Sequence, residues 1–127
     1  MTRPALPRGL VPGGPGRRFF RDMAAEYAFD TREAVLLAQA ARLLDEVAAL
    51  RALVAKDGEL IAGSRGQLVA HPGLIESRLR VEALNRLLSG LDLPPANATA
   101  DQPGGYSIAS LRGRKAADAR WNRDRSA

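Results

Sequence analysis

The stretch DGELIAGSRGQLVAHP, residues 57–72, lies between two long segments with helical patterning and decides how the chain turns back on itself. Two short runs, residues 59–62 and 67–70, stand on either side of Gly-Ser-Arg-Gly. That pattern is typical of a β-hairpin with a four-residue connection. We therefore predict that a short hairpin joins two helices at this point.

The glycines of this stretch also raise the possibility of a phosphate-binding loop. The stretch lacks the Lys-Ser/Thr ending of a nucleotide-binding loop. A Gly-x-x-Gly loop clamps nucleic-acid backbone when it joins two helices, whereas here it joins two strand-like runs. We therefore favour a turn over a phosphate loop, and only Arg65 at the tip remains a candidate for contact with DNA.

The only histidine of the chain, His71, precedes Pro72. Because a proline ring disfavours the helical conformation of the residue before it, we expect His71 to be extended and to cap or flank the next helix. A pH switch or a ligand role is the alternative. The chain has no cysteine and no paired-histidine spacing, and no nucleophile motif surrounds its serines. We predict no metal site, no cofactor and no catalytic residue, and hence no enzyme.

Both segments that flank the hairpin have helical periodicity. The first is expected over residues 31–56, with Asp30 or Thr31 as the cap and Glu33 placed for a capping box. The second is expected over residues 72–91. Their stripes repeat at heptad-like steps and are wider than one partner helix covers, which predicts antiparallel packing and self-association. The residues assigned to the core or the oligomer interface are Leu36, Leu43, Val47, Leu50, Val54, Leu74, Val81, Leu84 and Leu88.

The predicted architecture is mainly α, with long antiparallel helices joined by a short β-hairpin. Residues 1–16, which hold four prolines and four glycines, are expected to form a flexible basic arm. A first helix over residues 17–28 opens a helical core and oligomerisation domain, residues 17–93, with its hairpin at 59–70. Residues 94–105 have the composition of a linker, and residues 106–127 form a basic tail.

Positive charge gathers at the two ends of this 127-residue chain, whose net charge is +5. Residues 1–21 carry five arginines and no acid, residues 22–101 have a net charge of −4, and residues 102–127 have a net charge of +4. Arginine clusters bind polyanions through counterion release. The residues predicted to bind DNA are Arg3, Arg8, Arg17, Arg18, Arg21, Arg65, Arg112, Arg114, Lys115, Arg120 and Arg123.

Other interpretations of the basic ends stay open. They can be solubilising tails, or they can bind a protein partner instead of DNA. Trp121 suits either stacking on a base or docking on a protein. A membrane surface is less favoured because neither basic segment has a sustained apolar face. No apolar run approaches the roughly 20 residues that span a bilayer, and we expect an intracellular, soluble protein.

The order of these features resembles the small terminase subunit of tailed bacteriophages, in the form common among phages of high-GC hosts. Residues 16–47, GRRFFRDMAAEYAFDTREAVLLAQAARLLDEV, resemble that family's aromatic first helix and the long Ala/Leu helix that follows it. The family's hairpin resembles DGELIAGSRGQLVAHP, and its closing helix resembles residues 76–94, ESRLRVEALNRLLSGLDLP. The tail sequence RKAADARW, residues 114–121, adds a looser likeness.

This resemblance implies a non-catalytic component of the genome-packaging motor. Its partners would be double-stranded viral DNA, the large terminase subunit and further copies of itself in a ring, in the cytoplasm of the bacterial host. Many small terminases carry a separate N-terminal helix-turn-helix domain, whereas here the first helix leads into one too long for a recognition helix. We therefore expect binding through backbone charge and shape. The alternative is a phage or host interaction protein whose basic tails bind a protein partner.

Overall fold

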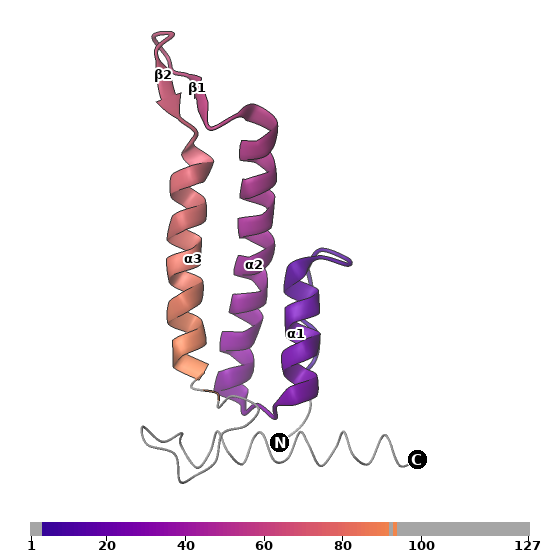
Figure 1. Ribbon diagram of the computed structural model, residues 1–127. Helices are drawn as coiled ribbons and strands as arrows, with labels where there is room; N and C mark the ends of the chain where they lie inside the picture. Colours follow the sequence, from indigo (N-terminus) through magenta and orange to yellow (C-terminus); the bar gives the residue numbers. More distant parts are fainter. Residues whose placement is uncertain (1–3, 92, 94–127) are drawn as a thin grey trace.

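The computed structural model describes residues 4–91 and 93. The elements follow in the order α1 (Pro15–Glu26), α2 (Thr31–Asp57), β1 (Leu60–Ala62), β2 (Leu68–Ala70) and α3 (Pro72–Leu91). The helices α2 and α3 run antiparallel, α1 lies along the N-terminal half of α2, and the hairpin projects from the far end of the α2–α3 pair (Figure 1). The predicted mainly helical fold with an intervening hairpin is confirmed. The expected linker (94–105) and basic tail (106–127) lie outside the described residues.

The long helix α2 begins and ends where its local sequence predicts. The Glu33 N–H donates to Asp30 Oδ1 at 2.8 Å, and the Asp30 N–H donates to Glu33 Oε2 at 3.0 Å, which completes the expected capping box. At the other end the Gly58 N–H donates to the carbonyl of Val54. Gly58 has φ 90°, a conformation that favours glycine, and so it ends the helix one residue after the predicted Lys56.

The helix α1 starts at Pro15 rather than residue 17, because proline is well suited to the first turn of a helix. It ends at Glu26 rather than residue 28. The next three residues, Tyr27, Ala28 and Phe29, are buried and turn the chain into α2. The end of α1 is therefore set by the burial of the aromatic side chains of Tyr27 and Phe29 and not by helix propensity.

The first sixteen residues differ from the expected flexible arm in the part that the structure describes. Residues 4–14 lie against the helices, and Leu10 is buried in the core. The carboxylate of Asp45 on α2 accepts the N–H of Val11 at 2.8 Å and the N–H of Gly16 at 2.9 Å. Asp45 therefore fastens this segment and the first turn of α1 to the middle of α2.

The core lies where the N-terminal segment, α1, the first half of α2 and the end of α3 meet. Leu37 is completely buried there, and Phe20 is packed beside it. The full cluster of buried residues is Leu10, Phe20, Ala24, Tyr27, Phe29, Leu37, Ala41 and Leu91. Three helices come together only at this end, so it buries more apolar surface than the α2–α3 pair does alone.

The nine residues predicted for the core or the oligomer interface occupy three different environments. Val47, Val54 and Leu84 are buried between α2 and α3. A second set is half-buried: Leu36, Leu43, Leu50 and Val81. Leu74 and Leu88, each 37% exposed, remain on the outside of α3. Only the last two sets are open to a second copy of the chain.

The hairpin pairs β1 and β2 in antiparallel register, with Ile61 opposite Val69. The Gly66 N–H donates to the carbonyl of Gly63 at 3.0 Å, and Gly66 has φ 77°. A turn followed by a left-handed glycine is a common way to close a short hairpin loop. On the face opposite Ile61, Leu60 and Leu68 are 60% and 71% exposed.

Candidate nucleic-acid interface

Three of the arginines predicted to bind DNA lie on α1, and with Arg8 they make up the basic surface of α1. Arg17 and Arg21 are four residues apart and share one side of the helix, with Arg18 next to them. Arg18 and Arg21 are exposed, and Arg8 is exposed on the segment before the helix. None of these four side chains forms an ion pair within the described part of the chain. Unpaired arginines are free to bind phosphate.

Arg17 is the most enclosed of the four. Its side chain is half-buried, and its Nε atom is buried without a hydrogen-bond partner in the structure. An unsatisfied guanidinium nitrogen costs free energy unless a further acceptor reaches it. Arg17 therefore differs from a freely solvated surface arginine.

The N-terminus of α1 itself is not open to an anion. Helix N-termini attract phosphate through their free N–H groups and positive dipole end. Here both oxygens of Asp45 already accept N–H groups at this position, from Gly16 and from Val11. Phosphate contact at α1 must therefore come from the arginine side chains.

The Gly-Ser-Arg-Gly turn is likewise occupied by its own hydrogen bonds. The Gly63 N–H donates to the carbonyl of Gln67, and the Arg65 N–H donates to Gln67 Oε1 at 3.0 Å. The Gly66 N–H is used inside the turn, as described above. A cradle of free N–H groups for phosphate is therefore not formed, which confirms the turn interpretation.

Arg65 is exposed at the hairpin tip but is not brought together with the arginines of α1. The N-terminus of α1 lies at Asp45, and the twelve residues from there to Asp57 extend about 18 Å along α2 before the hairpin begins. Figure 1 shows the hairpin beyond this end of the helices, away from α1. The remaining predicted DNA-binding residues lie outside the described part of the chain: Arg3, Arg112, Arg114, Lys115, Arg120 and Arg123.

His71 has the structural role that its position before Pro72 predicts. Its side chain is buried, and its Nδ1 accepts the Gly73 N–H at 2.9 Å in the first turn of α3. The proton must then be on Nε2, which lies 3.0 Å from Asp57 Oδ2 and donates to it. His71 therefore caps α3 and ties it to the end of α2.

A second link between α2 and α3 is the side chain of Arg80. Its Nη1 lies 2.6 Å from Glu76 Oε2 on the same helix, and its Nε lies 3.0 Å from Glu46 Oε2 on α2. The hydrogen bond with Glu76 and then that with Glu46 raise the pKa of Arg80 above its ordinary value. Arg80 and Glu46 are 34 residues apart, so no local sequence pattern indicates this pair.

Among residues 4–91 and 93, no group of three or more His, Cys, Asp or Glu side chains is arranged to hold a metal ion. No helix in the same part of the chain is both long enough and apolar enough to cross a membrane.

Comparison with known protein families, with curated proteins and with solved structures gives no match for this chain.

Proposed function

We propose that this protein is a non-catalytic DNA-binding subunit of a tailed-bacteriophage terminase. In this role it recognises viral DNA and delivers it to the large subunit, which holds the ATPase and the nuclease, for genome packaging in the host cytoplasm. The observation that carries the proposal is that four arginines, Arg17, Arg18 and Arg21 on α1 and Arg8 on the segment before it, form no ion pair among the described residues. The order of features along the sequence, which resembles that of small terminase subunits, suggests viral DNA as the ligand of this basic surface.

Self-association is the second part of the proposal. The α2–α3 pair leaves large apolar side chains on its surface, among them Leu53, Leu79 and Leu88. The hairpin adds Leu60 and Leu68, the most exposed of all. Large exposed apolar side chains are typical of a protein–protein interface, and copies packed around a ring would cover part of them.

A salt titration with duplex DNA tests the binding surface. Affinity is expected to fall steeply with salt, and each phosphate contact that is lost lowers the slope of log K against log salt by about 0.9. The double variant Arg18→Gln/Arg21→Gln should therefore reduce the slope by about 2. The matched control Arg42→Gln/Arg78→Gln removes two exposed arginines from α2 and α3 and should leave the slope nearly unchanged.

Weak binding at low salt, or equal slopes for the two double variants, would contradict DNA binding through α1. Light scattering of the purified protein tests the ring separately. A strictly monomeric species at all concentrations would count against it.

The alternative function is that of a phage or host interaction protein whose basic tails bind a protein partner. Deletion of residues 106–127 separates the two functions. If the deletion lowers DNA binding, the tail binds DNA. If it abolishes only the binding of a protein partner, the alternative function is favoured.

A further inference from the structure

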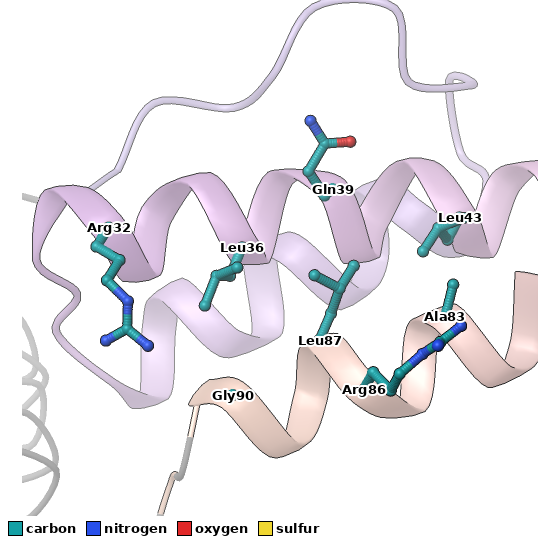
Figure 2. A pocket seen from close by; sticks show the side chains of 8 residues that line it. All are labelled: Arg32, Leu36, Gln39, Leu43, Ala83, Arg86, Leu87 and Gly90. Carbon is teal, nitrogen blue, oxygen red and sulfur yellow. The ribbon is translucent and has the colours of Figure 1, made fainter.

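A groove opens between the first half of α2 and the last turns of α3, at the opposite end of the pair from the hairpin. Its volume is about 560 Å³. Figure 2 shows Leu36 of α2 and Leu87 of α3 directed into the space between the helices, with Gly90 at the end of α3. Leu43 and Ala83 continue the apolar lining toward the middle of the pair.

The apolar lining of this groove is only partly covered by the chain itself. Leu36, Leu43 and Leu87 are half-buried, and no further helix packs over them in the described residues. Gly90 has no side chain, so the groove stays open at this end: a Cβ there would meet only Leu36 Cδ1, at 3.6 Å. Binding gains free energy here only if the partner removes these apolar side chains from water. An apolar partner does so, whereas a phosphate backbone would leave them hydrated.

Two arginines, Arg32 and Arg86, line the same groove, one from each helix (Figure 2). Neither forms an ion pair among the described residues, whereas Arg80 nearby on α3 is held by two carboxylates. Arg32 is in the first turn of α2, where the helix dipole disfavours a cation. A positive charge at Arg32 therefore does not stabilise the fold. It would be explained by an anionic partner that binds this side chain.

We propose that this groove, the Arg32–Arg86 groove, binds an acidic amphipathic helix of a partner protein. Large aliphatic side chains of that helix, such as leucine, enter between Leu36 and Leu87, and its carboxylates pair with Arg32 and Arg86. Gln39 of α2 is also among the residues that line the groove. The inference goes beyond the proposed function and uses no residue of the basic surface of α1. Leu36 and Leu43 also belong to the set predicted for the core or the oligomer interface, so self-association is measured beside peptide binding.

The test uses the full-length protein and a fluorescently labelled, helix-forming peptide with leucines on one face and glutamates on both sides of that face. One control peptide carries lysine in place of every glutamate, and another carries serine in place of every leucine. Fluorescence anisotropy should show binding of the acidic leucine peptide, with each control peptide weaker by about tenfold or more. The serine control separates groove binding from attraction of an acidic peptide to the basic ends of the chain.

Variants of the protein locate the site. Arg32→Gln/Arg86→Gln and Gly90→Glu should each weaken the acidic leucine peptide by about tenfold or more. Arg42→Gln/Arg78→Gln removes the same charge elsewhere, and Gly90→Ala adds a Cβ in ordinary contact with Leu36; both should bind like the parent protein. Far-UV circular dichroism of each variant verifies that it is folded.

Three results would overturn the proposal. Unchanged peptide affinity in Arg32→Gln/Arg86→Gln means that the groove is not the site. A loss of DNA affinity in this variant as large as that of Arg18→Gln/Arg21→Gln makes the groove part of a DNA surface. Loss of self-association in Gly90→Glu, measured by light scattering, means that a second copy of the chain fills it.

Discussion

At the scale of single residues, close backbone contact decides which positions tolerate change. Gly16 in the first turn of α1 lies so near α2 that a Cβ would overlap the carbonyl oxygen of Ala41. At Gly90, which is also helical, a Cβ would make only an ordinary contact with Leu36 Cδ1, at 3.6 Å. The same substitution should therefore have opposite effects at these two glycines.

We expect Gly16→Ala to lower the free energy of unfolding by about 1–3 kcal/mol, because α1 must move away from α2 and the core behind it loosens. Gly90→Ala is the control and should be neutral or stabilising by up to about 1 kcal/mol, since alanine is the better helix former. Urea denaturation followed by circular dichroism measures both. Equal stability of the two variants would show that α1 does not pack against Ala41.

His71 makes two side-chain hydrogen bonds, one with the Gly73 N–H and one with Asp57. Replacing it by alanine removes the cap of α3 and the contact with Asp57, and should cost about 1–2 kcal/mol. Asp57→Asn keeps an acceptor for the Nε2–H, so its effect should be smaller. Nitrogen-15 NMR of the imidazole is expected to show the proton on Nε2, and a proton on Nδ1 would contradict this geometry.

At the scale of elements, Asp45 joins three parts of the fold by accepting two backbone N–H groups. We expect Asp45→Ala to release residues 4–14 from α2 and to lower stability by about 2 kcal/mol, because two charge-assisted hydrogen bonds are lost. Trypsin should then cleave after the exposed Arg8 faster than in the parent protein. Asp22→Asn on the exposed side of α1 is the control and should leave the cleavage rate unchanged.

The ion pair of Arg80 with Glu46 is a weaker link between elements. Both side chains are partly solvated, so removal of the pair by Glu46→Gln should have little effect on the free energy of unfolding. A much larger loss, measured by urea denaturation, would mean that α2 and α3 depend on this bridge. The buried contacts of Val47, Val54 and Leu84 are the larger contribution to their packing.

At the scale of the whole molecule, apolar surface is unevenly covered. The three-helix end has a continuous buried core, whereas the hairpin end exposes leucines on β1, β2 and α3. We predict that Leu60→Ser/Leu68→Ser lowers self-association in light scattering with little loss of monomer stability, because both side chains are already largely exposed. A large loss of stability with unchanged association would contradict a role of this face between copies.

Much of the fold could be predicted because its determinants are local. The capping box at Asp30 and Glu33, the glycine at the end of α2 and the extended residue before Pro72 each depend on neighbours within four residues. The contacts of the segment before α1 could not be predicted, because its prolines and glycines indicate local conformational freedom only. Its order comes from Leu10 in the core and from Asp45, 34 residues along the chain.

The candidate sites divide in the same way. The charge of Arg17, Arg18 and Arg21 and their shared helix could be read from their spacing. That Arg32 and Arg86 line one groove could not, because the two residues are far apart in sequence and are joined only by the antiparallel return of α3. Arginine in the first turn of α2, against the helix dipole, was the one local signal.

The sequence by itself determined the helices, the hairpin between the two long ones and the segregation of charge, since hydrophobic period, caps and turn residues act over a few positions. Tertiary structure alone decided which apolar residues became core, which leucines stayed exposed, and which arginines remained unpaired. Those outcomes depend on contacts between residues distant in sequence, and it is the docking of α1 on one side of α2 and of α3 on the other that brings these residues together.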